Sequence, residues 1–505
     1  MTLLARTCVI TFRRTDLART KALVARPWFW CACILLVYFA FLTKTYYWDG
    51  VLFSLEIENV YEGKNPAATL FHPNHLIYTA FGYGVFWVAK WMALGVRALR
   101  VLQCANVLVS TLAGVVLFRL AGRIISVRGI PFFCWLLFAA GATWWKFSTD
   151  ANTYIICVLL LLLSALCLFW PKPRFVLAAS CHTLAMLFHE LAIFTYVPVI
   201  ALILIDATKP VSKRLRSCIA YCVGTGSVVT GAYLLCYSQA NHRTYPTLLS
   251  WVTSYASNSG FTRSVSQIIG LYFTSYLKLF GGGKLSMVRE FFSILECASL
   301  LLCVALLIWA IWVFTKRGEP NDGKIDQRGL LFLWTWFLAY AVFLGSWDPG
   351  SAFHKLFVWP PIVLLVGAYL AKTHYTRAHV TAFTVLAGAL AAWNFGAFIY
   401  PRSHTAADPV LALAEKLNRE LPKNATIYYR FFDTDDWYLA YFAPGREWKA
   451  LPTNTDAGSF VRSDNGTVCL ETTALEGFQG AIDASQTWQL VDGGHNIRLA
   501  CLNRP

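Results

Sequence analysis

PWFWCACILLVYFAFLTKTYYWDGVLFSLEIENVYEGKN is the sequence of residues 27–65, and this stretch decides the class of fold. Its first part, residues 27–45, is apolar enough to span a bilayer, which takes about 20 residues in a helix. Asp49 follows shortly after the end of that span, where hydrocarbon gives way to headgroups. The same stretch therefore predicts a membrane protein and supplies a first candidate for a functional residue.

The composition extends this membrane prediction to most of the chain. Of the 505 residues, 57% are hydrophobic and only 14% are charged, whereas soluble domains carry about 25% charged residues. The mean hydropathy is +0.51. A net charge of +16 would suggest a nucleic-acid partner in a soluble protein. Here the basic residues lie in short loops, where they set the topology and meet anionic membrane lipids, so we expect no nucleic-acid partner.

Apolar segments recur along residues 27–400 and predict a transmembrane domain of about eleven helices. The pair 175–188 and 190–205 is short for two spans, and one long helix is the alternative. We place the spans near residues 27–45, 101–118, 130–146, 152–170, 175–188, 190–205, 217–237, 291–315, 329–346, 354–371 and 379–400.

The positive-inside rule orients these spans. Residues 1–26 are basic and resemble a retained signal anchor, because no small-residue cleavage site follows at the right distance. The N-terminus is therefore expected in the cytoplasm. The C-terminus is expected outside it, in the periplasm beyond a cell inner membrane, or in the lumen if the membrane is that of the ER. The loops that share the N-terminal side are all basic, namely 119–128, 171–174, 208–216, 315–328 and 372–377.

Residues 72–91 are hydrophobic enough to form a further span. A span there would bring the basic loop 119–128 to the outer side and break the charge pattern. We therefore expect residues 50–91 to form juxtamembrane helices in the outer interface, with one face buried at the headgroup boundary. The many aromatic residues of this segment suit that interface.

The composition becomes polar after the last span, and residues 401–505 predict a small soluble α/β domain. The segment DPVLALAEKLNREL begins with Asp408 and has the pattern of an amphipathic helix, while TVCLET and NIRLACL have the composition of short strands. Cys469 and Cys501 are the cysteines of this polar region. They can pair if the region faces an oxidising compartment, and the sequence leaves this open.

Asp49 is the first candidate for catalysis. A positioned carboxylate can take the proton of an acceptor hydroxyl as the new bond forms, and partial desolvation strengthens such a base. The alternative is a structural Asp in a turn before Gly50. Glu56 and Glu58 could join Asp49 around a divalent metal. Because no D-x-D motif is present, we favour no metal and no cofactor, with Glu56 as a substrate-binding residue and Glu58 on a polar helix face.

His72, Pro73 and His75 form a compact polar group. Pro73 suits the first turn of a helix, so His72 can lie at a helix N-terminus and face an anion. An imidazole can donate to a phosphate oxygen or a sugar hydroxyl, which makes His72 and His75 candidates for substrate binding. The alternative is that both contact lipid headgroups, and their spacing alone gives a zinc site little support.

Two further outer segments carry candidates. In WWKFSTDANTY, residues 144–154, Asp150 is expected to assist Asp49 in catalysis or to bind the acceptor. In LAMLFHELAIF, His189 and Glu190 are ionisable residues among apolar ones, which by default mark a functional site in a membrane. We expect this pair to bind substrate, and a buried structural pair is the alternative. The motif H-E-x-x-H is absent, so a zinc protease is not indicated.

Cations that suit a phosphate follow later in the chain. The long outer loop 238–290 carries Lys284 and Arg289 beside a flexible GGGK stretch, and a phosphate or pyrophosphate headgroup needs such cations. His354 and Lys355 follow WDPGSAF at the outer end of a span and are further candidates for phosphate binding. For each single loop residue, contact with anionic lipid is the alternative.

These positions together resemble the C-type glycosyltransferase superfamily, in particular the protein O-mannosyltransferases and the bacterial enzymes that modify lipid A or cell-wall glycans. In that family a catalytic Asp follows the first span, as Asp49 does here, and an interfacial His-Pro element follows, as His72–Pro73 does. The family also has juxtamembrane helices, an acid in a second outer loop, matched by Asp150, and a polar hairpin tip. His189–Glu190 matches that tip, where relatives more often have Lys. The resemblance covers residues 27–400.

The resemblance implies the fold of that superfamily and a polyprenyl-phosphate sugar as the donor. It implies direct inverting transfer, in which Asp49 deprotonates an acceptor hydroxyl of a glycan, lipid or protein and the lipid phosphate leaves. Gly50 stands where many relatives have a second acid, which leaves open whether Glu56 takes that role. The alternatives are a multi-pass transporter or lipid flippase, and an inactive relative that serves as a scaffold. The absence of a repeat, with polar candidates on one face, favours the enzyme over a transporter.

Overall fold

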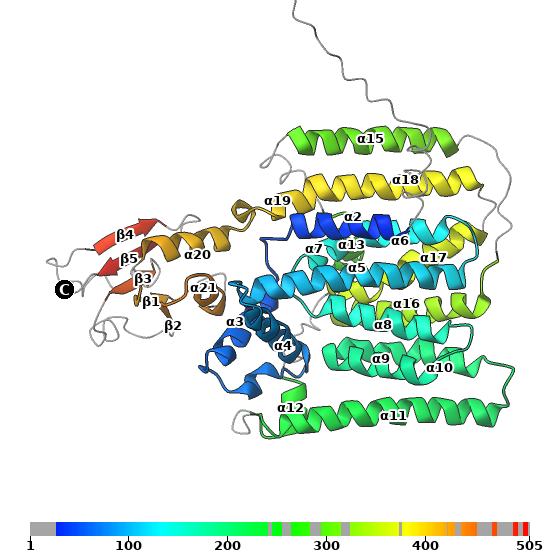
Figure 1. Ribbon diagram of the computed structural model, residues 1–505, viewed down its shortest axis with the longest axis horizontal. Coiled ribbons are helices and arrows are strands. Elements are labelled where there is room, and N and C mark those ends of the chain that lie inside the picture. The colour runs from blue at the N-terminus through cyan, green and yellow to red at the C-terminus, as the bar shows by residue number, and fades with distance from the viewer. Residues whose placement is uncertain are drawn as a thin grey trace, which may run out of the picture.

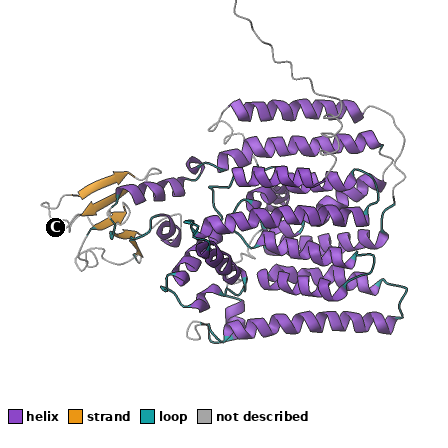
Figure 2. Ribbon diagram, in the orientation of Figure 1, coloured by secondary structure: helices purple, strands orange, loops and turns teal. Residues whose placement is uncertain are grey.

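The chain folds into a long bundle of helices that carries a small domain with a β-sheet at one end (Figure 1, Figure 2). The protein is thus an α-helical polytopic membrane protein with an appended α/β domain, as its sequence predicts. The predicted cytoplasmic segment 1–26 and the candidates Lys284 and Arg289 lie outside the described residues. The computed structural model describes residues 27–240, 245–254, 264–282, 294–314, 324–372, 376–421, 423–429, 436–451, 467–471, 488–492 and 498–502.

Each predicted span contains one bundle helix, although the helices differ in length. Among the described residues, four helices are long and apolar enough to cross a membrane, a bent pair makes a fifth, and six shorter apolar helices accompany them. They lie roughly parallel in the bundle (Figure 1). The bundle helices are α2 (Pro27–Ala40), α5 (Ala98–Ile124), α6 (Ile130–Ala140), α8 (Tyr154–Leu168), α9 (Phe175–Phe188), α10 (Tyr196–Leu204), α11 (Val211–Tyr237), α15 (Ile294–Phe314), α16 (Gln327–Trp347), α17 (Trp359–Lys372) and α18 (Arg377–Asn394).

The predicted span 130–146 is broken in the structure. Helix α6 and the following α7 (Ala142–Ser148) meet at Gly141 and are bent by 68°. Gly141 lies against the indole of Trp359, since a Cβ atom at this position would come within 2.6 Å of the ring. The indole also donates to the carbonyl of Phe138 at 2.9 Å. The close contact with Trp359 requires a glycine at the bend, and a count of apolar residues cannot detect such a bend.

The short pair of predicted spans forms a helical hairpin. Helix α9 ends before His189, which adopts an extended conformation with φ −159°, and the chain continues through the 3₁₀ helix η2 (Glu190–Thr195) into α10. Inside the hairpin, the ring of the buried His182 contacts the carbonyl oxygen of Ala192 at 2.9 Å. The alternative of one long helix is therefore wrong, and His189 lies at the tip.

The segment expected at the outer interface forms helices at one end of the bundle. Helices α3 (Trp48–Tyr61) and α4 (Tyr78–Trp91), with the 3₁₀ helix η1 (Ala67–Leu70) between them, gather at this end and do not run along the bundle (Figure 1). Helix α4 leaves Trp87 and Trp91 exposed. Exposed aromatic side chains on a helix at this level suit burial in the headgroup boundary.

A mixed five-stranded sheet forms the centre of the C-terminal domain (Figure 2). The strand order is β2-β1-β3-β5-β4, with β1 parallel to β2 and β3 and the remaining pairs antiparallel. Helix α20 (Pro409–Glu420) begins after Asp408, whose carboxylate accepts from two backbone N–H groups at 3.1 Å and caps the helix. The strands are β1 (Thr426–Tyr429), β2 (Glu447–Ala450), β3 (Val468–Glu471), β4 (Trp488–Asp492) and β5 (Arg498–Leu502).

The C-terminal domain lies at the same end of the bundle as α3 and α4 (Figure 1). Its helix α21 (Asp436–Phe442) packs against α3. Cys469 and Cys501 are directly opposite each other on β3 and β5 and form a disulfide. Their pairing, which the sequence left open, is thus present in the folded domain.

Candidate active site

Asp49 lies in the first turn of α3, and its Oδ2 accepts a hydrogen bond of 2.5 Å from the Tyr47 hydroxyl. That hydroxyl lies 3.2 Å from the hydroxyl of Tyr154 on α8. Burial raises the pKa of Asp49 above its ordinary value. The hydrogen bond from Tyr47 and the imidazoles of His72 and His354 act in the opposite direction but are smaller effects. Asp49 is therefore a partly desolvated carboxylate, which is a stronger base than a solvated one.

Gly50 explains how Asp49 comes close to the second outer loop. A Cβ atom at Gly50 would lie 2.1 Å from the carbonyl oxygen of Ala151, so only glycine permits this approach of α3 to the loop. Both Asp49 and Gly50 are inside the helix. The alternative of a turn at Asp49 is therefore wrong, and the glycine serves helix–loop packing.

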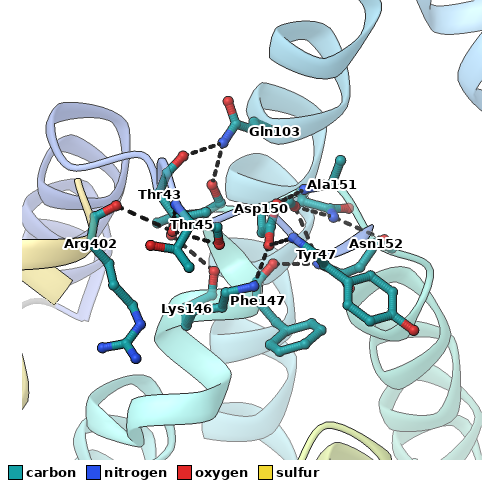
Figure 3. Close-up of polar contacts among 12 residues, drawn as sticks. Thr43, Thr45, Tyr47, Gln103, Lys146, Phe147, Asp150, Ala151, Asn152 and Arg402 are labelled. Atoms are coloured by element: carbon teal, nitrogen blue, oxygen red, sulfur yellow. Dashed lines mark hydrogen bonds and ion pairs between the residues drawn. The ribbon is translucent and has the colours of Figure 1, made fainter. Parts of the chain in front are cut away.

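Asp150 holds the backbone that leads into α3 (Figure 3). Its Oδ2 accepts from the backbone N–H of Tyr47 at 2.8 Å and pairs with Lys146 Nζ at 2.5 Å, and its Oδ1 accepts from the backbone of Ala151 at 2.8 Å. Asp150 is completely buried. The ring of Tyr47 points away from it in Figure 3. This arrangement favours a role in positioning Asp49 over contact with an acceptor.

Two amide side chains on α5 fix the same loops. Gln103 Nε2 donates to the carbonyl oxygens of Thr43 and Thr149 at 2.9 and 3.0 Å (Figure 3). Asn106 Nδ2 donates to the carbonyl oxygen of Asp150 at 2.7 Å. Both amides are buried. Helix α5 thus fixes the loop before Asp49 and the loop that carries Asp150 relative to each other.

His72 and Glu56 form a polar pair beside Asp49. The Nε2 atom of His72 lies 3.0 and 2.9 Å from the two carboxylate oxygens of Glu56, and both side chains are partly exposed. The ring of Phe53 contacts those of His72 and His75. Burial lowers the pKa of His75 to about 3, so its imidazole is neutral at physiological pH. The structure thus brings both predicted histidines to the site, with His75 in its buried wall.

His189 is a buried wall residue with one unsatisfied donor. Its ring packs against those of Tyr154 and His75, with centroids 5.0 and 4.7 Å away. Burial lowers its pKa, so the ring is neutral. The Nδ1 atom accepts from the backbone of Leu191 at 3.2 Å, so the proton is on Nε2. Among the described residues, that Nε2–H has no acceptor.

His354 also reaches this cluster, whereas Lys355 does not. His354 Nδ1 lies 2.9 Å from Asp348 Oδ2, and its ring lies 5.9 Å from that of Tyr154. Lys355 is completely buried and donates to the carbonyl oxygens of Pro349 and Ser351 at 3.0 and 3.2 Å. The expectation that Lys355 binds phosphate is therefore not favoured, because its ammonium holds the loop before η4 (His354–Phe357).

Glu190 begins η2 at the hairpin tip and is partly buried. Its backbone N–H donates to the carbonyl oxygen of Asn74 at 3.3 Å. This contact joins the hairpin tip to the segment of His72 and His75. A substrate contact by the Glu190 carboxylate stays a prediction.

Sequence reasoning missed Tyr47, Tyr154 and Asp348. The two tyrosines belong to stretches that are rich in aromatic residues, and such stretches are expected at a membrane interface without any catalytic role. The sequence signal that could have found them is their closeness to the candidate acids, because Tyr47 is two residues from Asp49 and Tyr154 is four residues from Asp150. Asp348 lies in WDPGSAF, next to the candidate His354, but nothing in the sequence shows that they pair.

Glu56 and Glu58, which could have joined Asp49 around a metal, have other partners. Glu56 contacts His72, while Glu58 binds Arg97 with Nη2–Oε2 at 2.7 Å. In the part of the chain that the structure describes, no three His, Cys, Asp or Glu side chains are grouped to hold a metal ion. The arrangement at Asp49 is suited to proton transfer, because a desolvated carboxylate lies beside the hydroxyls of Tyr47 and Tyr154.

Two solved structures share the fold over almost the whole length of both chains. The crystal structure of ArnT from Cupriavidus metallidurans bound to undecaprenyl phosphate has a TM-score of 0.63 at 12% identity, covering 96% of this chain and 98% of that chain. The apo form of that protein has a TM-score of 0.61 at 12% identity, covering 97% and 98%. No protein-family model and no curated protein sequence matches the chain.

Proposed function

We propose that this chain, which has the fold of the C-type glycosyltransferases, is a membrane-embedded inverting glycosyltransferase. In this proposal the donor is a polyprenyl-phosphate sugar, and the acceptor is a hydroxyl group of a glycan, lipid or protein. The reaction takes place at the periplasmic face of an inner membrane, or at the luminal face of the ER membrane in a eukaryote. The ArnT structure that contains undecaprenyl phosphate supports a donor of this lipid class.

The position of Asp49 carries the proposal. Its carboxylate lies at the start of α3, is desolvated enough that its pKa is raised, and is held by the Tyr47 hydroxyl. A base with a raised pKa is better matched to an alcohol proton than an ordinary carboxylate. Asp49 is in the first turn of α3, and α3 gathers with α4 at one end of the bundle, where we expect a lipid-linked substrate to approach it (Figure 1).

The reaction is a single displacement. Asp49 accepts the proton of the acceptor hydroxyl, and the acceptor oxygen forms a bond to the anomeric carbon of the sugar. The bond between that carbon and the phosphate oxygen breaks, its electron pair stays on the phosphate, and polyprenyl phosphate leaves. Attack opposite to the leaving group inverts the anomeric configuration.

One histidine supplies a donor for the departing phosphate in this proposal. His189 presents a buried Nε2–H that has no acceptor among the described residues. His72 and His354 each place one ring nitrogen against a carboxylate, Glu56 or Asp348. Burial lowers the pKa of His354, which disfavours a proton on its second nitrogen. A substrate contact by His72 stays a prediction. Donors aimed at developing charge stabilise a transition state more than the ground state. Lys284 and Arg289 lie outside the described residues, and their phosphate contact stays part of this proposal.

Two observations support the outer location of the site. The disulfide Cys469–Cys501 lies in the domain next to Asp49, and disulfides persist in oxidising compartments. The basic loops, by contrast, follow the helix ends that are remote from this domain, as the positive-inside rule requires of cytoplasmic loops. The loop 205–211 at the opposite end of the bundle is one example (Figure 1).

The arrangement of the polar residues also favours an enzyme over a transporter or flippase. Transporters place their substrate site near the middle of the bilayer, often at broken helices. Here the rings of His189 and His354 lie 6.4 Å apart, and His72 and His354 both act on the pKa of Asp49. Helix α3, which carries Asp49, lies at one end of the bundle, beside the C-terminal domain (Figure 1).

The proposal is tested by identifying the lipid and then the reaction. The protein is purified in native nanodiscs, and mass spectrometry of the bound lipid is expected to find polyprenyl phosphate. The purified protein is then incubated with undecaprenyl phosphate that carries radiolabelled hexoses or pentoses and with membrane glycolipid acceptors. Release of undecaprenyl phosphate with label transfer supports the proposal, whereas transmembrane movement of an intact lipid-linked sugar without any transfer contradicts it.

A further inference from the structure

The start of α5 is capped by residues from two other parts of the chain. The N-cap residue Arg97 provides no side-chain cap of its own. Instead the backbone N–H of Ala98 donates to Glu58 Oε1 at 2.8 Å, and the N–H of Leu99 donates to the Tyr441 hydroxyl at 3.1 Å. The first N–H groups of a helix need partners from outside it. Here they are supplied by α3 and by α21 of the C-terminal domain.

Glu58, Arg97 and Tyr441 form one connected group, which we call the Glu58 cluster. Glu58 pairs with Arg97 Nη2 at 2.7 Å and accepts from the Tyr441 hydroxyl at 3.1 Å. The guanidinium of Arg97 lies over the Tyr441 ring, 3.6 Å from its centroid. Tyr441 is 1% exposed and the Glu58 side chain 14%. The contacts of the Tyr441 hydroxyl are sheltered from water, whereas the Arg97 side chain is 43% exposed, so its ion pair with Glu58 is partly screened by solvent.

The cluster connects to Asp49 along two routes. Glu58 is on the same helix as Asp49, nine residues later or about 14 Å along α3. Gln103, about 8 Å along α5 from Ala98, donates to the carbonyl of Thr43 in the loop before Asp49. Helix α3, which carries Asp49, and helix α5, which holds the loop before it, are therefore joined at the cluster.

We propose that the C-terminal domain is part of the catalytic unit, and that Tyr441, with Glu58 and Arg97, positions Asp49 through α5 and α3. These three are positioning residues, because none touches the carboxylate. The inference rests on the proposed function of Asp49 as the base. This inference explains why the C-terminal domain lies at this end of the bundle. The domain supplies Tyr441, which completes the N-terminal cap of α5.

The chain offers a matched pair of variants. Tyr441→Phe removes a hydroxyl that contacts Leu99 and Glu58. Tyr438→Phe removes a hydroxyl from the same helix that donates to Asp408 Oδ2 at 3.1 Å, within the C-terminal domain. Both tyrosines are 1% exposed, so each variant loses one buried hydroxyl and no ring. Arg97→Lys keeps the charge but loses the forked contact with Glu58, and serves as a second test.

The first measurement separates kcat from KM for the donor. Tyr441→Phe is expected to lower kcat roughly tenfold with an unchanged donor KM, because small displacements of a base are costly to catalysis. Tyr438→Phe is expected to keep wild-type kcat. A Tyr441→Phe enzyme that loses thermal stability but keeps its kcat would show that the cluster is only structural and would overturn the inference.

The second measurement does not depend on activity. Hydrogen exchange is followed by mass spectrometry in the full-length protein. Tyr441→Phe is expected to speed exchange of the amides at 98–103 and also at 46–50, and Tyr438→Phe is not. Faster exchange confined to 98–103 overturns the coupling to Asp49. If the coupling is found but the wild type transfers no sugar from undecaprenyl phosphate, the proposed function fails and the structural link remains.

Discussion

The Tyr47 hydroxyl donates a hydrogen bond of 2.5 Å to Oδ2 of Asp49. The same tyrosine is held by its backbone N–H, which donates to the buried carboxylate of Asp150. One residue thus joins the candidate base to the acid of the second outer loop. Asp150 positions the backbone of Tyr47, and Tyr47 positions and stabilises the charged form of Asp49. The two acids that the sequence singled out therefore lie in different environments, which favours different roles.

Replacing Tyr47 by Phe should shift the pH dependence of transfer. The Tyr47 hydrogen bond lowers the pKa of Asp49, while burial raises it. Without the hydroxyl, the pKa of Asp49 rises further and the acidic limb of the kcat/KM profile moves to higher pH, because the base must be deprotonated to act. The profile is measured from pH 4 to 9 on a fixed donor. A limb that stays in place, or moves to lower pH, contradicts this role of Tyr47.

His189→Phe should weaken donor binding. The ring packs among aromatic neighbours, so Phe preserves the packing. It removes the Nε2–H that has no acceptor among the described residues, and also the Nδ1 that accepts from the backbone of Leu191. A hydrogen bond to a charged group is worth about 1.5–3 kcal/mol, so the Kd for undecaprenyl phosphate should rise roughly 10- to 150-fold. His189→Gln retains an N–H and should lose less. Equal affinity of the Phe variant and the wild type in a fluorescence titration excludes this contact.

Asp150→Ala should destabilise the fold. Its removal leaves Lys146 largely buried without its anion and takes the acceptor from two backbone N–H groups. Breaking a buried ion pair from one side typically costs about 3–5 kcal/mol. The melting temperature in detergent should drop clearly for Asp150→Ala and less for Asp150→Asn, which keeps an acceptor oxygen. A substrate-binding Asp150 would instead give normal stability with a raised acceptor KM.

Cysteine labelling tests the orientation in the membrane. Lys64, near the interface helices, and Lys209, at the opposite end of the bundle, are both exposed. In a variant whose other free cysteines are replaced, Lys64→Cys should react with a membrane-impermeant maleimide in intact cells, and Lys209→Cys only after permeabilisation. The reverse pattern would place the site in the cytoplasm and contradict the proposed function.

Much of the fold could be predicted because its signals are local. Apolar length located a bundle helix in every predicted span, and loop charge showed that residues 50–91 stay at one end of the bundle. The break at Gly141 could not be predicted, because it depends on the indole of Trp359, more than two hundred residues later. Likewise, apolar composition could not distinguish a hairpin at His189 from one continuous helix.

The candidate site was predicted in part for the same reason. Asp49 and His354 were found from their places next to apolar spans, and His72 from its compact group with Pro73 and His75. His189 was found because ionisable residues are rare among apolar ones. The structure brings these residues together. Lys355 was found in the same way as its neighbour His354, but its ammonium donates hydrogen bonds to backbone carbonyl oxygens of its own loop. The direction in which a side chain points is set by tertiary packing, so a sequence pattern does not predict it.

The most direct test of the account is the turnover of purified Asp49→Asn. The amide matches the carboxylate in size and can still accept from Tyr47, so the melting temperature should stay near that of the wild type. Transfer from the polyprenyl-phosphate sugar should fall by about 10²–10⁴-fold, because the amide cannot take the acceptor proton. A folded Asp49→Asn protein that transfers sugar at close to the wild-type rate would contradict the assignment of Asp49 as the base.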